Sequence, residues 1–277
     1  MKIRILMLLM LGMTVVSCEQ IEQQSNVSVQ QEQVTNKLSE HITKRKSADR
    51  GYFDHDWLKT YHTFSFGSYA SEDYEDFRDL WVINEDIIKK DSGFGDHEHE
   101  NMEILVYLIS GSLEHTDSLG NKHVMQAGDV HLMSAGTGVT HAERNAYEGD
   151  THFIIVWISP DRNGIEPAYQ KWQRPENIAD MKKIVLASKT GTKGAMKIQQ
   201  DASIYKIQLD KGEKVTHQLE KDRGLWLQVI DGSGMMNGVA FEKGDGLHTE
   251  AGGEYQFIAR DKIEALLIDL MEVFFNN

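Results

Sequence analysis

The sequence predicts an all-β protein made of two similar units with few short helices. Short segments rich in branched aliphatic and aromatic residues recur about every 8–12 residues and are separated by glycine turns, which is typical of β-sandwiches and β-barrels. The chain has 277 residues, more than one typical domain, and 40% of them are hydrophobic, enough for two cores. Motifs of the first half also return in the second half.

The N-terminus predicts export and lipid attachment. Lys2 and Arg4 precede an apolar run over residues 5–16 that is short for a membrane span, so residues 1–17 indicate a signal peptide. The run ends at Ser17 and Cys18, which resemble a bacterial lipoprotein box, and Cys18 is the chain's single cysteine. We expect a lipoprotein held to a membrane by Cys18, facing the periplasm or the cell exterior, with residues 18–45 as a polar tether.

The first globular unit is expected over residues 46–164. Aromatic density rises after Asp49, and strands are predicted at residues 80–84, 104–109, 113–116, 130–133 and 153–158. Glycine turns separate them, for example at residues 91–95 and 126–130. Residues 165–183 hold two of the three prolines and are expected to be a linker, followed by a second unit over residues 184–277.

Two pairs of residues predict a metal site in the first unit. His97 and His99 are two apart, as are His141 and Glu143, so on β-strands each pair shares one face. If the two strands lie in one small barrel, three imidazole nitrogens and a carboxylate oxygen can meet at one ion. Glu103 is a fifth candidate, because alternation along one strand would place it on the same side as His97 and His99.

The second unit repeats the first without these ligands. Residues 229–233 (VIDGS) match residues 108–112 (LISGS), and the spacing from Gly244 to Gly252 equals that from Gly128 to Gly136. His217 falls near the position of His97, and the other ligand positions are matched, in sequence order, with Leu219, Phe257 and Ala259. We therefore expect the second unit to be a scaffold that binds no metal.

Charge and the remaining residues limit the function further. The net charge of −14 argues against nucleic acid, and the only dense basic run, residues 44–46, is short. Aromatic residues before the first predicted strand could line a pocket, although core packing is expected for at least half of them: Tyr61, His62, Phe64 and Phe66. Five other histidines are interpreted as turn or surface residues: His115, His123, His131, His152 and His248.

Several long motifs in order resemble the pirin family of bicupin proteins. They are Arg50-Gly51 and the segments 57–66 (WLKTYHTFSF), 82–86 (VINED), 97–104 (HEHENMEI), 113–121 (LEHTDSLGN) and 133–141 (MSAGTGVTH). The resemblance covers residues 46–277 and is strongest in the first unit. It implies two stacked cupin β-barrels, the first bearing the metal and the second degenerate.

The resemblance also implies a cofactor and a reaction. Pirins bind one metal, usually iron, through residues that correspond to His97, His99, His141 and Glu143, which makes Glu103 an alternative ligand or a residue behind the ligands. We expect Fe²⁺, with Ni²⁺, Mn²⁺, Cu²⁺ or Zn²⁺ as alternatives. Relatives resemble quercetin 2,3-dioxygenases, which open a flavonol ring with O₂. We expect a monomer that acts on a flavonol or another phenolic or enolic substrate.

The catalytic roles stay open from sequence. Glu143 could serve as the base for the substrate hydroxyl as well as a ligand, and Glu103 is the fallback base. Glu98, Glu100 and Asn101 replace residues that pirins often have, which would add acids to the rim and disfavour an anionic substrate. The competing hypotheses are a non-catalytic metal-binding or redox-responsive module that engages another protein, and hydrolase or isomerase chemistry without O₂.

Overall fold

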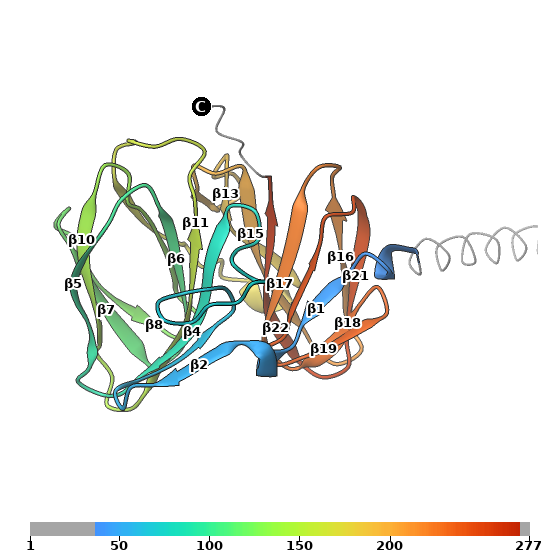
Figure 1. Cartoon of the computed structure of the whole chain (residues 1–277), viewed down its shortest axis with the longest axis horizontal. Helices are drawn as coiled ribbons and strands as arrows, with labels where there is room; N and C mark the ends of the chain where they lie inside the picture. The colour runs from blue at the N-terminus through green and yellow to red at the C-terminus, as the bar shows by residue number, and fades with distance from the viewer. Residues whose placement is uncertain (1–36, 272–277) are drawn as a thin grey trace, which may run out of the picture.

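The computed structural model describes residues 37–271. The expected signal peptide, the lipid-bearing Cys18 and most of the predicted tether lie outside these residues. In the described part of the chain, no helix has the length and apolar character needed to cross a membrane. The described chain forms two β-sandwiches that stand side by side (Figure 1).

The first half contains one large and one small antiparallel sheet. The seven-stranded sheet has the order β12 (Ala168–Lys171), β9 (Val130–Ser134), β6 (Glu103–Ser110), β11 (Thr151–Ile158), β4 (Leu80–Ile88), β3 (Leu58–His62) and β2 (Gly51–Asp54). The four-stranded sheet has the order β5 (Gly93–His99), β10 (Val139–Asn145), β7 (Ser112–Asp117) and β8 (Lys122–Gln126). The candidate ligands lie on β5 and β10 of the small sheet.

The second half repeats this arrangement. Its seven-stranded sheet has the order β1 (Thr43–Arg45), β20 (Gly246–Thr249), β17 (Gly224–Asp231), β22 (Ile263–Leu270), β15 (Ala202–Leu209), β13 (Lys183–Ser188) and β14 (Met196–Lys197). Its four-stranded sheet has the order β16 (Lys214–Leu219), β21 (Gly253–Ala259), β18 (Ser233–Met236) and β19 (Val239–Glu242). Two short 3-10 turns, η1 (Ser47–Asp49) and η2 (Ile178–Asp180), accompany the strands.

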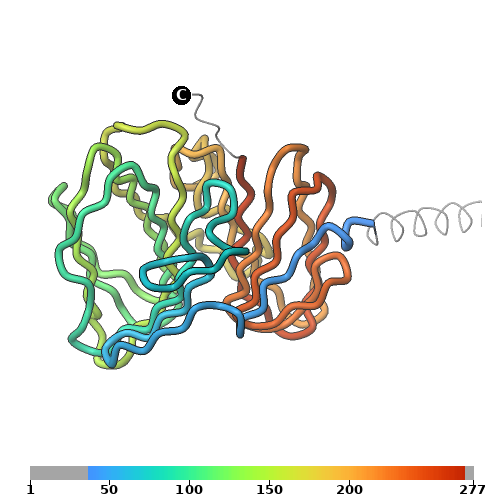
Figure 2. Tube along the Cα trace, in the orientation of Figure 1, coloured from blue at the N-terminus to red at the C-terminus, as the bar shows by residue number. Residues whose placement is uncertain are grey.

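The prediction of an all-β protein with two cupin units, as β-barrels or β-sandwiches, is confirmed, and both units are sandwiches. Each half is a sandwich of two separate sheets with free edges. Two strands lie outside the predicted unit boundaries. β1 pairs with β20 of the second half, although it precedes the first half in the sequence, and β12 pairs with β9 of the first half from within the predicted linker. Figure 2 shows the blue N-terminal segment running from the second half to the first.

The core lies in three layers. The two seven-stranded sheets pack against each other and bury aliphatic side chains from both halves, among them Ile83, Leu105 and Leu266. Phe64 crosses this interface, with its ring centroid 4.8 Å from that of Trp226. A second apolar cluster fills the sandwich of the second half, and a third fills only part of the first. The rest of the first sandwich is open to a cavity.

Strand registers correct the sequence match between the halves. His141 pairs with His97, and Tyr255 pairs with His217. On the other side of the same strand, Asn145 pairs with Leu113, two residues after Gly111. In the second half, Ala259 likewise pairs with Gly234, two residues after Gly232. The counterparts of His141 and Glu143 are therefore Tyr255 and Phe257, so the match to Phe257 and Ala259 is wrong.

The reason for that error is a shortened turn. Val139, which pairs with His99, comes three residues after Gly136, whereas Gly253, which pairs with Leu219, follows Gly252 directly. The second half thus lacks two residues of the turn that precedes this strand, and a fixed offset counted from the preceding glycines fails beyond it.

Candidate active site

Three histidines converge on the inner face of the small sheet in the first half. His97 and His99 alternate on β5, and His141 stands opposite His97 on β10. Each of the three offers a nitrogen, and these atoms lie within 4.8 Å of one another. Ring centroids are 4.3 Å apart for His97 and His141 and 5.0 Å apart for His99 and His141. The predicted pairing of the two His-bearing strands thus gives a compact cluster of nitrogen donors.

The protonation of these rings suits a cation. His97 Nδ1 lies 2.8 Å from the Gly95 carbonyl oxygen, so this nitrogen donates its proton and leaves Nε2 as a free lone pair. Burial and the neighbouring His97 lower the pKa of His99 to about 4. Burial and the adjacent imidazoles lower the pKa of His141 to about 3, and neither of its ring nitrogens has a hydrogen-bond partner. The lowered pKa values keep His99 and His141 neutral, and neutral imidazole nitrogens are the form that binds a transition metal.

Glu143 lies between the three-histidine cluster and a second group of buried side chains, His115 and His131. It follows His141 on the same face of β10 and lines the cavity with His97 and His99. Its carboxylate nevertheless forms a second group with His115 and His131, whose ligand atoms also lie within 4.8 Å of one another. Burial, followed by repulsion from the Asp86 carboxylate, raises the pKa of Glu143 to about 8. The structure thus brings three of the four expected ligands into one group and places the fourth at its border.

The expectation that His115 and His131 are turn or surface residues is wrong. They are 0% and 1% exposed and lie behind Glu143. His115 Nε2 lies 2.9 Å from an Asp117 oxygen, and His131 Nδ1 lies 3.1 Å from the Tyr169 hydroxyl. His131 Nε2 stands 3.8 Å from Glu143 Oε1. The two imidazoles therefore form a buried polar layer that fixes the surroundings of Glu143.

The prediction that Glu103 lies on the same side as His97 and His99 is wrong. β5 ends at His99 and β6 begins at Glu103, with a turn between them in which Asn101 has a φ of 50°. Alternation along a single strand therefore does not apply. Glu103 is 1% exposed and accepts hydrogen bonds from Ser134 Oγ at 3.0 Å and from the Gln199 amide at 3.2 Å. It joins the two halves and does not line the cavity.

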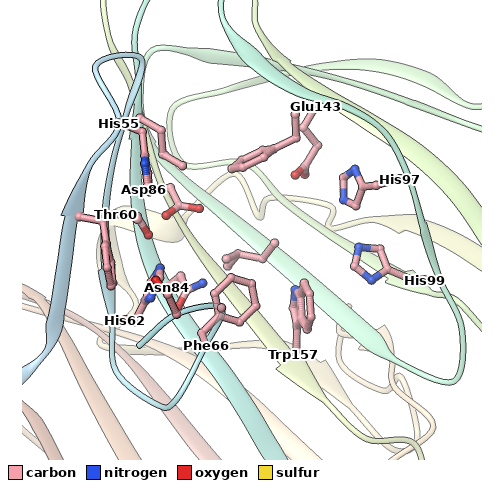
Figure 3. A pocket seen from close by; sticks show the side chains of 16 residues that line it. His55, Thr60, His62, Phe66, Asn84, Asp86, His97, His99, Glu143 and Trp157 are labelled. Carbon is pink, nitrogen blue, oxygen red and sulfur yellow. The ribbon is translucent and has the colours of Figure 1, made fainter. Parts of the chain in front are cut away.

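A cavity of about 310 Å³ opens in front of the candidate ligands. Its walls are mostly apolar and aromatic: Phe53, Leu58, Phe66, Phe94, Ile155 and Trp157. The side opposite His97 and His99 is polar and carries Thr60, His62, Asn84 and Asp86 (Figure 3). A largely apolar cleft with a few convergent polar groups is the usual form of a small-molecule site.

Of the four aromatic residues predicted as possible pocket lining, two line the cavity and two do not. His62 and Phe66 line the cavity. Phe64 lies in the core between the halves, and the Tyr61 ring lies under the Arg50 guanidinium, 4.9 Å from its carbon. Sequence reasoning missed Asn84, Asp86 and Trp157, which face the cavity from β4 and β11 inside otherwise apolar runs.

The expected acidic rim is not directed at the cavity. Glu98 alternates with His97 and His99 on β5, so its exposed side chain points to the opposite face. Glu100 is exposed in the turn that follows, and the Asn101 side chain accepts a hydrogen bond from the Gly164 amide at 2.8 Å. Asn101 therefore stabilises the loop at Gly164, and Glu98 and Glu100 lie on the solvated surface.

Comparison with known proteins agrees with this geometry. Residues 42–158 match the pirin family, and residues 185–270 match the quercetinase C-terminal cupin domain. The chain is 40% identical to a quercetin 2,3-dioxygenase of Escherichia coli K12, over 84% of this chain and 100% of that protein. The chain belongs to the pirin family. This pirin is also 36% identical to a pirin-like protein of Caulobacter vibrioides, over 81% of this chain and 98% of that protein.

A solved structure adds a metal to the comparison. The bacterial pirin YhhW from Escherichia coli, crystallised in complex with nickel(II), has a TM-score of 0.79 and 38% identity to this pirin, covering 84% of this chain and 100% of that one. The relationships place this pirin among the quercetinase-like oxidoreductases with a cupin fold. Together with the histidine cluster, they support a metal-binding cupin site.

Proposed function

We propose that this pirin is a metal-dependent dioxygenase that acts with O₂ on a flavonol or a related phenolic or enolic compound. The observation that carries the proposal is a cluster of three imidazoles, with Glu143 beside it, at the end of an aromatic cavity. The cavity is of a size suited to a small aromatic molecule. The relatives named quercetin 2,3-dioxygenase support the same reaction class.

His97, His99, His141 and Glu143 are proposed to hold one divalent metal. Three neutral nitrogens and one carboxylate suit several first-row ions, so we propose Fe²⁺ as the working metal, with Ni²⁺ as the leading alternative because YhhW was crystallised with it. When bound, the metal supplies a Lewis acid that polarises the enolic oxygen of the substrate.

The residues of the chain itself perform the remaining steps. Glu143 lies at the cavity, and its pKa is raised to about 8 by burial and by Asp86, so without a metal this carboxyl group holds a proton at neutral pH. Because its carboxyl group lies at the cavity, Glu143 is also the candidate base for the proton of an enol. Trp157 and Phe66 flank the same space, with ring centroids 5.5 Å apart in an edge arrangement, and can orient a flat aromatic ring while excluding water.

The test is turnover of quercetin by metal-loaded protein in air. We expect loss of the flavonol absorbance together with oxygen uptake, and neither change with metal-free protein. His99→Gln removes a candidate ligand and should abolish both signals, whereas His123→Gln, a partly exposed position on β8, should leave them intact. Tight metal binding without turnover of any flavonol would instead favour a non-catalytic metal-binding module, and substrate loss without oxygen uptake would favour hydrolase or isomerase chemistry.

We further propose that the chain is exported and anchored through Cys18. The support is the sequence alone: a short apolar run after Lys2 and Arg4 that ends at the single cysteine. Cys18→Ser should release the protein from the membrane fraction, and mass spectrometry of the wild-type protein should find lipid on an N-terminal Cys18. A soluble wild-type chain that begins elsewhere and carries no lipid would refute the anchor.

A further inference from the structure

The polar wall of the cavity is defined here as Thr60, His62, Asn84 and Asp86, on two paired strands. Thr60 of β3 stands opposite Asp86 of β4, and His62 stands opposite Asn84. All four side chains are between 3% and 6% exposed. They face the candidate ligands across the cavity (Figure 3). They are therefore too far inside the sandwich to be solvated surface residues.

Three atoms of the polar wall have no hydrogen-bond partner. Asn84 Oδ1, Asp86 Oδ1 and His62 Nδ1 are buried and make no hydrogen bond with the protein. Buried polar atoms in proteins are nearly always paired, and leaving them unpaired costs free energy. Two of the three are oxygens that accept hydrogen bonds, so the group that completes them must carry hydrogen-bond donors.

The second half shows that the fold does not require this wall. Registers across the equivalent strands match Asp86 with Ile207 and Asn84 with Tyr205. His62 corresponds to Val185 by its pairing with Asn84. Ile207 is 1% exposed and packs in the apolar core of its sandwich. Thr60 corresponds to Lys183 by its pairing with Asp86, so the second half keeps neither the amide of Asn84 nor the carboxyl group of Asp86 at these strand positions.

Aromatic side chains border the wall on both sides. The His62 ring centroid lies 5.2 Å from that of Phe53 and 5.1 Å from that of Phe66. A ligand that reaches the wall must therefore present a flat apolar body to these rings and polar groups at its tip. A phenol does this, because its O–H donates a hydrogen bond while its oxygen accepts one, which also suits either orientation of the Asn84 amide.

We propose that the polar wall is a second recognition subsite, which binds adjacent hydroxyl groups on the end of the substrate remote from the metal. The substrate class is then a polyphenol with neighbouring ring hydroxyls, such as quercetin, in preference to flavonols whose pendant ring is bare. The inference rests on the proposed function in that one end of the substrate lies at the histidine cluster. Asn84 and Asp86 determine specificity, and neither belongs to the metal ligands.

The experiment measures binding without turnover. Full-length protein loaded with Ni²⁺ is titrated under nitrogen with quercetin and with the flavonol that lacks hydroxyls on its pendant ring. We expect the wild-type protein to bind quercetin about tenfold more tightly, the effect of one or two net hydrogen bonds. Asn84→Leu and Asp86→Leu should reduce that preference to about twofold or less, whereas Asp86→Asn, which keeps an acceptor, should retain most of it.

The ratio of the two dissociation constants separates recognition from damage. A variant that is merely misfolded weakens both ligands equally and leaves the ratio unchanged, and Trp81→Leu, on the exposed side of β4, controls for alteration of the strand. Equal affinity of the wild-type protein for both flavonols, or an unchanged ratio in both leucine variants, would overturn the proposal. A clear preference without turnover in air would contradict only the proposed dioxygenase function, and turnover without a preference would contradict only the subsite.

Discussion

The two sandwiches of this pirin have the same topology and opposite interiors. In the first, the inward positions of the small sheet hold His99, His141 and Glu143. In the second, the register-matched positions hold Leu219, Tyr255 and Phe257, all at most 1% exposed.

The comparison shows which inward-facing side chains the sandwich fold requires and which it can replace. The second half closes the same sandwich with Leu219, Tyr255 and Phe257, so the fold does not require the imidazoles of His99 and His141 or the carboxyl group of Glu143. The position of His97 keeps a histidine in both halves, and His217 lies 2.8 Å from an Asp269 oxygen. Buried polar groups with unpaired atoms cost free energy, which a bound metal and substrate can offset. The first half holds the candidate active site, and the second half packs against it through the shared apolar core.

The largest expected effect is loss of the metal centre when a candidate ligand of the first half is replaced by an apolar side chain, as at Leu219 of the second half. His141→Leu should lower metal affinity and turnover by more than about 100-fold, because a direct ligand matters more than the groups behind it. The metal-free variant should be at least as stable as the metal-free wild type, because an unpartnered buried imidazole is removed. Metal content, oxygen uptake and urea unfolding measure the three quantities. A variant that keeps full metal content would show that His141 is not a ligand.

The reverse exchange should be poorly tolerated. Phe257→Glu introduces a glutamate at the position of the second half that corresponds to Glu143. No imidazole layer surrounds this position, and Met236 stands opposite it. We expect a loss of about 3 kcal/mol or more in the free energy of unfolding, from an unpaired buried carboxyl group and lost packing. Phe257→Leu is the matched control and should cost less. Similar losses for the two variants would mean that the second interior accepts an acid after all.

Glu103 gives a pH-dependent effect at the junction of the halves. Burial raises its pKa from 4.5 to about 7, so its protonated form stabilises the native state below pH 4.5, and this stabilisation is lost as the pH rises through about 7. Relative to Glu103→Gln, which stays neutral, the wild-type protein should lose on the order of 2 kcal/mol between pH 4.5 and 8. Urea unfolding of both proteins across this range measures it. A pH-independent difference would contradict the raised pKa.

The smallest effect is expected behind the ligands. His131→Leu copies Leu247, its counterpart after the Gly128-Asp129 and Gly244-Asp245 turns, and removes the imidazole that stands 3.8 Å from Glu143. We expect about a tenfold loss of metal affinity, in the range seen when groups behind metal ligands are removed. Elemental analysis should give one metal per chain in the wild-type protein. Two metals would mean that the group of His115, His131 and Glu143 is filled as well.

Much of this architecture could be predicted from sequence, because a β-strand can be recognised from the residue pattern of its own segment. Alternation along a strand was enough to place His97 with His99 and to bring both to His141. It failed at Glu103, because a turn at Asn101 separates two strands that look like one. No local spacing distinguishes the shortened turn before β21.

The missed residues depend on pairing between distant strands. His115 has no second histidine beside it in the sequence, and its role appears only when β7 pairs with β10 and sets it opposite Glu143. Asn84 and Asp86 alternate within a buried strand and become a wall only because β3 and β11 flank it. Such cross-strand neighbours are fixed by tertiary structure, which no local pattern encodes.

The pairing of β1 with β20 has a consequence for the order in which the chain can fold during synthesis. β1 is made first, yet its partner β20 comes roughly two hundred residues later, so the second sheet acquires its outermost strand only when nearly the whole polypeptide has been made. Pairing over such a distance is slow, because the intervening chain must first be brought together. The second sandwich is therefore not self-contained, and a break in the chain between β12 and β13 would separate it from the segment that carries its edge strand.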